Sequence, residues 1–435
     1  MERKPVIVIF DIGKTNKKCL VYDADYEVVY SAFFDTPAVE DPEGFPTEDL
    51  VALKSAMDAQ LRIVLDDATL ELRAVNFTTY GATIVNTDAE GKVVHTLWDY
   101  LRPYDAGVME LFERDHGHNG AVYAQTASPS LGNLNTGLQL YLLKHTDSNT
   151  FSRIAQSTWL PQYLSGLYTG SMFSESTSIG CHTLCWDFTR KAFAAWTSAE
   201  HIDRLFPPMR LAAEPLRTDL TGHSIIVGIG MHDSSSALLP YLRSIDQPFM
   251  LLSTGSWSIC LNPFNDAPLT PAELAADCLC YLTYTGQPVK ASRLNAGFRH
   301  TEKVEALCGQ HDKPKEFFWS LRWDAHSGSF SMKEGMGLSA SDLAAANEYF
   351  EFLRDLVAEQ LEKISMVASE SVRHIYVDGG FSKNAIFMGL LRQGLPGWTI
   401  LAAEVGQSTA LGAAMVLHEH WNPKPLRKDL VRFSG

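Results

Sequence analysis

Short apolar runs separated by turn residues open the chain, a pattern that is typical of strands. Val6–Phe10 is uninterrupted and ends at Asp11, and two further runs, Lys17–Tyr22 and Glu27–Phe34, follow after short polar breaks. Such runs, bounded by glycine, asparagine or aspartate, predict a meander of three neighbouring strands.

After this meander, stretches with apolar residues at helical spacing alternate with further strand-like runs. The expected helices span residues 48–65, with Thr47 as N-cap, 134–144, 158–168, 199–205, 347–367, 384–392 and 408–418. The expected strands span residues 74–79, 225–230, 249–253, 257–261 and 373–377, with a hairpin of residues 83–86 and 92–97 and a polar loop at 170–178. Because strands and helices alternate in both halves, the sequence predicts the α/β class.

Chain-breaking residues concentrate between Pro207 and Gly222, and they predict a domain boundary. We place an N-terminal domain at residues 1–224 and a C-terminal domain at residues 225–435, which suits a chain of 435 residues at roughly 100–200 residues per domain. The hairpin at 249–261 repeats the layout of the first hairpin: an apolar strand, a turn of small residues with a glycine, and a second strand. This repetition indicates an internal duplication, with one phosphate-binding type of turn in each half.

The composition is that of an ordinary globular protein, with 46% hydrophobic and 20% charged residues. A net charge of −15 repels a polyanion, so we expect no nucleic-acid partner. No apolar stretch reaches the roughly 18 residues of a membrane helix, and the run after Lys4 is too short for a signal peptide. We therefore expect a cytoplasmic protein without a membrane partner, either a monomer or a homodimer.

The seven cysteines have irregular spacing, which favours reduced thiols over a disulfide framework. Cys181-His182-x-x-Cys185 contains residue types that bind metals. No second pair stands at zinc-finger spacing, however, so we expect no zinc site.

The turn between the first two strands carries the first candidate chemistry. Gly13 allows backbone N–H groups to approach a phosphate, and Thr15, Asn16 and the neighbouring lysines add donors. Asp11, at a strand end, is placed to hold Mg²⁺ through water. An ordinary hairpin with solvated lysines explains the same residues. A P-loop is excluded, because Val8 stands where the G-x-x-x-x-G-K-[ST] pattern requires glycine.

Two later turns have similar chemistry. Thr254-Gly255-Ser256 joins the strands of the second hairpin, and its hydroxyl groups and glycine suit phosphate oxygens. Gly379-Gly380 follows a buried strand, where bare backbone lets a flat ligand such as a purine lie close. The plain alternative for this turn is a strand-to-helix connection with Ser382 as N-cap. Gly228-Ile229-Gly230 is no dinucleotide fingerprint, because Asp233 occupies its third glycine position.

Asp233 lies between a strand and a helix, where a carboxylate is able to accept the proton of a sugar hydroxyl during phosphoryl transfer. A nearby triphosphate would raise the pKa of this carboxyl group, and Mg²⁺ would lower it. The alternative is that Asp233 is only an N-cap, which is common for aspartate before a helix.

Five segments follow one another along the chain. They are Asp11-x-Gly13-x-Thr15-Asn16, Gly230-x-His232-Asp233, Thr254-Gly255-Ser256, Asp378-Gly379-Gly380 with Asn384, and Glu404-x-x-x-Ser408-x-x-Leu411-Gly412-Ala413-Ala414. In this order and spacing they resemble the FGGY family of carbohydrate kinases over nearly the whole chain. Residues 160–178, 232–237 and 253–258 resemble its branch of rhamnulokinases and fuculokinases.

The resemblance implies two α/β domains of ribonuclease-H-like, actin-type fold, with ATP and Mg²⁺ in the cleft between them. It implies Asp233 as the catalytic base, Asp11 and Asp233 beside the metal, and His232 against the sugar. Further sugar contacts are implied for Tyr80, Gly81, Trp98, Asp99 and Arg102. ATP contacts are implied for Gly13, Lys14, Thr15, Asn16, Lys18, Thr254, Gly255, Ser256, Gly379, Gly380 and Asn384.

Three residues depart from the family's pattern. Lys18 stands where the family has arginine, Lys14 where it has a small residue, and Phe381 where it has a third glycine. A lysine cannot form the bidentate fork of an arginine with a phosphate, so which of the two lysines contacts phosphate stays open.

The implied activity is ATP-dependent phosphorylation of a small ketose. A 6-deoxy-ketohexose such as L-rhamnulose or L-fuculose is favoured, with a pentulose close behind because one methyl group changes discrimination by only about 1–3 kcal/mol. Alternatives from other classes are a non-catalytic sugar-sensing regulator on the same fold and an actin-type ATPase. The presence of Gly13 and Asp233 favours an enzyme, and the His232-Asp233 pair favours a sugar acceptor.

Overall fold

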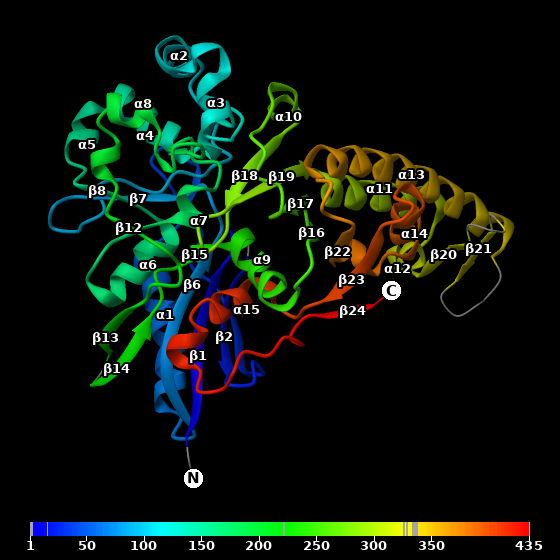
Figure 1. The fold of residues 1–435 in the computed structure, drawn as a ribbon, viewed down its shortest axis with the longest axis horizontal. Helices are drawn as coiled ribbons and strands as arrows, with labels where there is room; N and C mark the ends of the chain where they lie inside the picture. Colours follow the sequence, from blue (N-terminus) through cyan, green and yellow to red (C-terminus); the bar gives the residue numbers. More distant parts are fainter. Residues whose placement is uncertain are drawn as a thin grey trace.

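The structure is a computed structural model. It describes residues 3–434 except Thr15, Thr221, residues 325–326, Gly328 and residues 333–337. Two halves are visible in Figure 1, and each is built around one large sheet. Within the described residues, every helix is too short or too polar to span a bilayer.

The first sheet has the strand order β13-β14-β6-β1-β2-β3, and β15 adds to β6. Its strands are β1 (Lys4–Ile12), β2 (Lys17–Asp23), β3 (Val28–Phe34), β6 (Leu70–Thr79), β13 (Leu216–Leu220), β14 (His223–Val227) and β15 (Met231–His232). The first three strands are antiparallel neighbours, which confirms the predicted meander. On the other side of β1, β6 lies parallel to it, and β14 lies parallel to β6.

The second sheet has the order β18-β19-β17-β16-β22-β23-β24. Its strands are β16 (Met250–Thr254), β17 (Ser258–Asn262), β18 (Cys278–Leu282), β19 (Pro288–Leu294), β22 (His374–Gly379), β23 (Thr399–Glu404) and β24 (Arg432–Ser434). β16 pairs antiparallel with β17 and parallel with β22, as β1 pairs with β2 and β6. The two sheets therefore share one central layout, as the duplication in the sequence requires.

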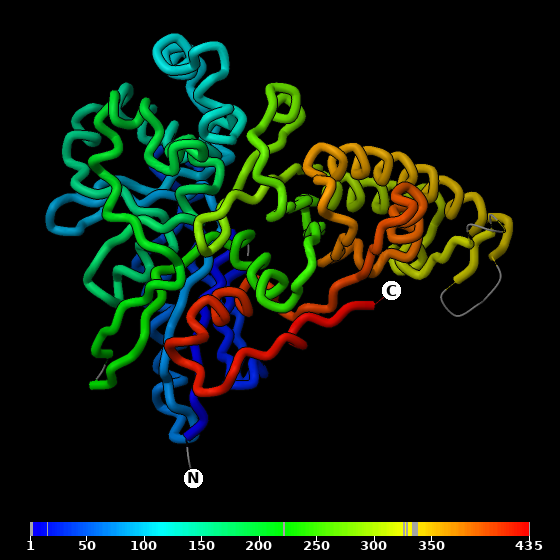
Figure 2. Tube along the Cα trace, in the orientation of Figure 1, coloured from blue at the N-terminus to red at the C-terminus, as the bar shows by residue number. Residues whose placement is uncertain are grey.

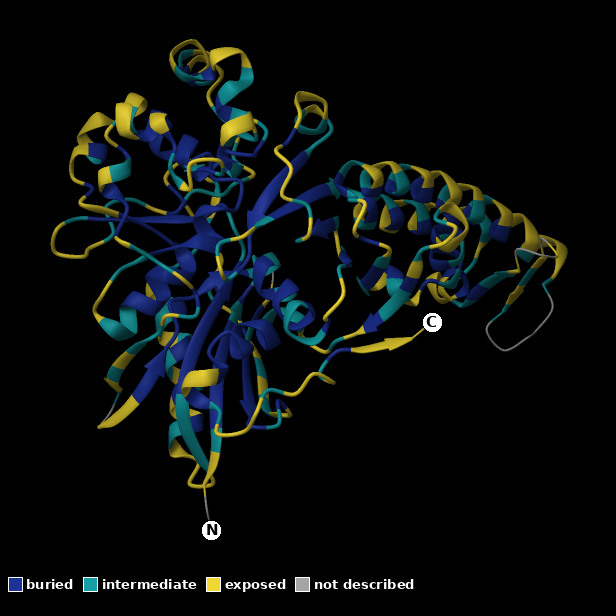
Figure 3. Cartoon of the chain, in the orientation of Figure 1, coloured by how far each residue is buried: buried dark blue, intermediate teal, exposed yellow. Residues whose placement is uncertain are grey.

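Helices cover both faces of the first sheet, because successive side chains of a strand point to opposite sides. Val8 and Phe10 pack in the core formed with α1 (Leu50–Asp66), whereas Ile7 and Ile9 pack with α9 (Asp233–Ser244) and α15 (Ser408–Met415). In the second half, α13 (Ala340–Val367) and α14 (Ala385–Gly394) pack on the sheet. The central strands are buried along most of their length (Figure 3), so the core runs through both sheets.

A mainly helical region follows β6 in the chain. It contains β7 (Ile84–Thr87), α2 (Ala106–Phe112), α3 (Ala121–Gln125), α4 (Thr136–Thr146), α5 (Ser148–Ser152), β8 (Gln156–Trp159), α6 (Leu160–Thr169), β9 (Ser174–Glu175), α7 (Ser176–Ile179), β10 (Trp186–Asp187), β11 (Ala192–Phe193), α8 (Ala195–Ala199) and β12 (Met209–Arg210). The hairpin expected from residues 83–97 is wrong. β7 pairs with β8 instead, because Ile84 and Trp159 share a core, and Val93 makes only an isolated bridge to Thr87.

The remaining helices and short strands lie outside the two sheets. They are β4 (Val39–Glu40), β5 (Pro46–Thr47), α10 (Pro271–Ala275), α11 (Ala296–His311), α12 (Lys315–Ser320), β20 (Leu321–Asp324), β21 (Ser329–Met332) and α16 (His418–Trp421).

Several local expectations are corrected by hydrogen bonding. Asp49 rather than Thr47 caps α1, because its carboxylate accepts two backbone N–H groups of the first turn. The loop expected at 170–178 contains β9 and α7, and buried Glu175 caps α7. The helix expected at 199–205 is only a short 3-10 turn, and the helix expected at 408–418 ends at Met415.

The strands change sheet between β15 and β16. The boundary expected at residues 224/225 lies inside β14, which belongs to the first sheet because it pairs with β6. α15 then returns from the second half to pack against α9 and β1. The trace in Figure 2 shows this return before the chain rejoins the second sheet at β24.

Candidate active site

A tightly held loop after β14 delivers His232 and Asp233. Gly230 has a φ of 83°, and a Cβ there would lie 2.5 Å from the carbonyl oxygen of Pro161, so the position requires glycine. Gln162 Nε2 donates to the Gly230 carbonyl at 2.9 Å. The loop is therefore fixed against the start of α6.

Asn76 on β6 ties the same loop to α15, a role that its sequence context does not indicate. Its Oδ1 accepts the N–H of Gly230 at 3.2 Å, and its Nδ2 donates to the carbonyl of Ala413 at 2.7 Å. A Cβ at Gly228 would lie 2.0 Å from Asn76 Oδ1, so the close packing depends on that glycine. One buried amide thus connects β6, the loop and the returning helix.

Asp233 is the first residue of α9, and the residue at the N-cap position is His232. Oδ1 of Asp233 accepts from the N–H of Ser234 at 2.6 Å and from its hydroxyl at 3.2 Å. Burial raises the pKa of Asp233 to about 6, and the bonds from Ser234 oppose this rise. The expectation that Asp233 is the N-cap of α9 is therefore wrong, because His232 occupies that position.

Asp11 lies near the end of β1, opposite Lys18 in β2. Its pKa is raised to about 6 by burial first and by the charge of Asp233 second, while Lys18 lowers it. Two neighbouring carboxylates that disfavour each other's charge suit a divalent cation. In the part of the chain that the structure describes, no group of three or more histidine, cysteine, aspartate or glutamate side chains is arranged to hold a metal alone.

The first turn is closed by its own backbone. The N–H of Gly13 donates to the carbonyl of Asn16 at 2.9 Å, and a Cβ at Gly13 would lie 2.9 Å from that oxygen. Asn16 is exposed, and Thr15 lies outside the described residues. Glycine is therefore needed for the shape of this turn.

The two lysines of the first turn point in different directions. Lys14 Nζ contacts Asp99 Oδ1 at 2.6 Å and lies 4.0 Å from the centre of the Tyr100 ring. Lys18 Nζ instead donates to Gln407 Oε1 at 3.0 Å, next to the start of α15. Lys14 is thus directed toward the residues predicted to contact the sugar, and Lys18 toward the second half.

The second turn uses its residues unequally. Thr254 is buried, and its hydroxyl donates to the carbonyl of Asp378 at 2.5 Å and accepts the N–H of Phe381 at 3.0 Å. Gly255 and Ser256 are exposed at the tip. The hydroxyl of Thr254 therefore links β16 to the third turn, whereas Gly255 and Ser256 remain accessible to a ligand.

The third turn borders a cavity of about 660 Å³, lined by Asp378, Gly379, Gly380, Ser382, Lys383, Ala402, Ala403, Glu404, Val405, Gly406 and Ser434. Gly379 has a φ of 88°, and a Cβ there would lie 1.9 Å from the carbonyl oxygen of Thr254. Asn384 does not line this cavity. It is the buried N-cap of α14, so the expectation that Ser382 is the N-cap is wrong.

Three of the six predicted sugar contacts, Tyr80, Trp98 and Asp99, line one cavity of about 250 Å³. Its walls include Lys14, Lys17, Val39, Glu48, Tyr80, Thr83, Leu97, Trp98, Asp99 and Tyr100. Lys17 is buried and contacts Glu48 at 3.1 Å, a pair that the sequence did not single out. Arg102 lies apart in a second cavity, where it contacts Asp41 at 2.9 Å and also pairs with Glu43.

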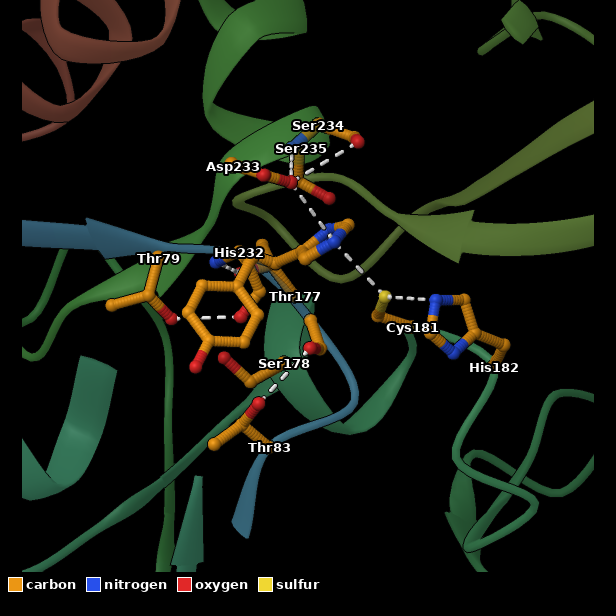
Figure 4. A network of polar contacts seen from close by, with 12 residues as sticks. Thr79, Thr83, Thr177, Ser178, Cys181, His182, His232, Asp233, Ser234 and Ser235 are labelled. Carbon is orange, nitrogen blue, oxygen red and sulfur yellow. Dashed lines mark hydrogen bonds and ion pairs between the residues drawn. The ribbon is translucent and has the colours of Figure 1, made fainter. Parts of the chain in front are cut away.

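His232 connects this cavity to Asp233. A small enclosed space beside His232 is bounded by Tyr80, Gly81 and Thr83, and Tyr80 and Thr83 also line the larger cavity. His232 Nε2 lies 3.1 Å from Asp233 Oδ1 and 3.0 Å from Cys181 Sγ, as Figure 4 shows. Burial lowers the pKa of His232 to about 3, so the imidazole that lies beside Asp233 is neutral.

Comparison with known proteins adds independent information. Residues 6–239 match the model of the FGGY family of carbohydrate kinases, N-terminal domain. The rhamnulokinase of Bacteroides thetaiotaomicron is 24% identical over 214 residues, which cover 47% of this chain and 43% of that protein. The L-fuculokinase of Salmonella typhi is 24% identical over 281 residues, which cover 60% of this chain and 57% of that protein. The chain thus spans about half the length of these curated relatives.

Solved structures of similar fold cover almost the whole chain. A carbohydrate kinase from Novosphingobium aromaticivorans has a TM-score of 0.76 at 21% identity and covers 97% of this chain and 93% of its own. A ligand-bound xylulose kinase from Lactobacillus acidophilus has a TM-score of 0.78 at 15% identity, and the match covers 99% of this chain and 93% of that one. The fold is therefore the predicted actin-type arrangement of two sheet-cored halves. Because the family model matches more than half of the chain, the chain belongs to the FGGY family of carbohydrate kinases.

Proposed function

We propose that this protein transfers the γ-phosphoryl group of ATP to a hydroxyl group of a small, uncharged sugar, with Asp233 as the general base. The observation that carries the proposal is the position of Asp233. Its half-buried carboxylate lies close enough to Asp11 to raise the pKa of that residue, and it lies beside His232, which lines a small space next to the predicted sugar pocket. Membership in a family of carbohydrate kinases supports the same reaction.

A general base needs a lone pair that is not already used by a neighbouring donor. Oδ1 of Asp233 accepts from the N–H and the hydroxyl of Ser234 and lies 3.1 Å from His232 Nε2, whereas none of the described residues donates to Oδ2. We assign Oδ2 as the atom that takes the proton of the attacking sugar hydroxyl. The hydroxyl oxygen forms its bond to the γ-phosphorus as the bond to the β,γ-bridging oxygen breaks.

Asp11 and Asp233 are the residues that would hold Mg²⁺, because their mutual repulsion favours a cation beside them. When bound, Mg²⁺ would neutralise charge on the phosphate oxygens. Gly13 shapes the first turn, Gly255 and Ser256 are the turn residues available to the phosphates, and the cavity beside Gly379 and Gly380 would take the nucleoside.

The pocket of about 250 Å³ suits a sugar of five or six carbons. Its ion pairs, Lys14 with Asp99 and Lys17 with Glu48, offer hydrogen-bond donors and acceptors together, as hydroxyl groups require. Apolar side chains such as Leu97 on the same wall favour a 6-deoxy-ketohexose such as L-rhamnulose or L-fuculose. A pentulose such as xylulose is the alternative acceptor.

The test is a coupled ADP-release assay with Mg-ATP and a panel of sugars. The panel contains L-rhamnulose, L-fuculose, D- and L-xylulose, L-ribulose and glycerol. One ketose should raise ADP release far above the rate without sugar. If no sugar raises that rate while ATP binds, the proposed activity is wrong.

A further inference from the structure

We propose that Arg102 is a positioning residue of the sugar pocket, whose guanidinium group clamps two loops together and so keeps the outer wall of the pocket in place. This role presupposes the proposed function, because it concerns binding of the sugar. The resemblance to the kinase family implies a direct sugar contact for Arg102. In the structure, Arg102 instead lines the neighbouring cavity of about 690 Å³.

The first loop spans residues 35–48, between β3 and α1. Both of its ends line the sugar pocket, whereas the turn at its middle lines the second cavity. β4 and β5, which lie in this loop, pair with each other and join neither large sheet. Within the described residues, Thr47 and Glu48 at its C-terminal end are the only members of the loop, besides those held by Arg102, that make polar contacts with the rest of the chain.

Asp41 closes the turn at the middle of this loop and also binds Arg102. Its Oδ1 accepts the backbone N–H groups of Glu43 and Phe45, both at 2.9 Å. Its Oδ2 accepts from Arg102 Nη1 at 2.9 Å, and Arg102 pairs with Glu43 as well. The side chains of Asp41 and Arg102 are only 1% and 11% exposed. Removing either charge would leave the other buried without its partner, which is a costly state.

Arg102 ends the second loop, which carries Trp98 and Asp99 into the wall of the sugar pocket. The N–H of Arg102 donates to the Asp99 carbonyl at 3.0 Å. Nδ2 of Asn133 donates to the Arg102 carbonyl at 2.8 Å and so anchors this backbone to the mainly helical region. The side chain of Arg102 therefore extends from a fixed backbone to the first loop.

The guanidinium group also lies against two aromatic rings, one from each loop. Its central carbon is 5.0 Å from the ring centre of Phe45 and 5.0 Å from that of Trp98, within the range of cation–π attraction. Trp98 lines both the sugar pocket and the second cavity, so its indole is part of the partition between them. Loss of the guanidinium would thus release the first loop and the indole together, and the pocket wall would move.

The first test is ¹⁹F NMR of the full chain labelled with 5-fluorotryptophan, without ATP or sugar. Loss of one signal in Trp98→Phe assigns that residue. The decisive variant is Asp41→Asn, which leaves Arg102 and both rings intact. An amide has a single oxygen, so it cannot serve both the turn and the guanidinium group. We expect the Trp98 signal to shift or broaden in Asp41→Asn, as in Arg102→Met. An unchanged Trp98 signal in Asp41→Asn would overturn the inference.

Kinetics then separate positioning from direct contact, with the panel ketose that gives the highest rate. Arg102→Met and Asp41→Asn should each raise the KM for sugar by about ten- to hundredfold, the worth of a hydrogen bond between charged groups, with the KM for ATP unchanged. The double variant should be no worse than either single one, because both changes break the same clamp. A raised KM in Arg102→Met alone would indicate direct contact with the sugar and would contradict the inference.

Asp187→Asn is the matched control. Asp187 is buried and closes the β10–β11 hairpin in the same way, by accepting the N–H groups of Thr189 and Arg190. It should keep the wild-type Trp98 signal and the wild-type KM for sugar. If it changes both, any weakened turn produces the effect and the clamp is refuted. The spectra need no substrate, so they decide on the clamp even if no sugar is accepted, which is the result that refutes the proposed function.

Discussion

Replacing Asp233 by asparagine should remove the base while keeping the side chain in place. Oδ1 of Asp233 accepts from the N–H and hydroxyl of Ser234, at 2.6 and 3.2 Å, and lies 3.1 Å from His232 Nε2. An amide oxygen is able to accept the same two bonds. The amide nitrogen then occupies the place of Oδ2, where it is a donor and cannot take a proton.

Because positioning is retained, the variant loses only the contribution of general-base catalysis. That contribution is a factor of about 10²–10⁴, or about 3–5 kcal/mol of activation free energy. We expect kcat for sugar phosphorylation to fall by this factor. The KM for ATP should stay within about twofold of wild type, because the lost interaction belongs to the transition state.

The assay is sugar-stimulated ADP release, with the rate without sugar subtracted. Asp88→Asn is the matched control, since Asp88 is also half-buried and its carboxylate accepts backbone N–H groups of Glu90 and Lys92 far from the site. It should retain the wild-type rate. If Asp233→Asn keeps more than about a tenth of the wild-type kcat, Asp233 is not the base.

Three further predictions concern the sugar, the nucleotide and the metal. Lys14→Met should raise the KM for sugar and leave the KM for ATP unchanged, because Lys14 contacts Asp99; a change confined to ATP would contradict this placement. In Gly379→Ala the new Cβ would lie 1.9 Å from a carbonyl oxygen, so the variant should lose about 1–3 kcal/mol of stability and have a lower Tm. Calorimetry should also show weaker ATP binding by this variant. Excess EDTA should abolish ADP release and added Mg²⁺ should restore it; persistent activity in EDTA would exclude the metal role of Asp11.

The sequence predicted those parts of the fold whose signal is local. The runs around Val8 and Leu20 are continuous and apolar because both faces of their strands are buried, and they were assigned correctly. The hairpin predicted for residues 83–97 is wrong, because β7 pairs with β8. The side chains that bring these two strands together share a core but lie far apart in the sequence. Pairing between distant segments leaves no local pattern.

The candidate site divides in the same way. The motifs around Gly13, Asp233 and Gly379 are visible because each needs a glycine or carboxylate at a strand end. Asn76 and Cys181 have no such signal, since each contacts atoms of residues far along the chain. The place of Lys14 in the first turn predicts a phosphate contact, and only the fold shows that its side chain reaches Asp99.

The most direct test of the central claim is to identify the product by ³¹P NMR after incubation of the protein with Mg-ATP and the most stimulating ketose. Transfer to the sugar predicts a sugar-phosphate signal that grows in equal amount with ADP, with little inorganic phosphate. ADP accompanied by inorganic phosphate alone would mean that water is the acceptor, and would contradict the assignment of a sugar kinase.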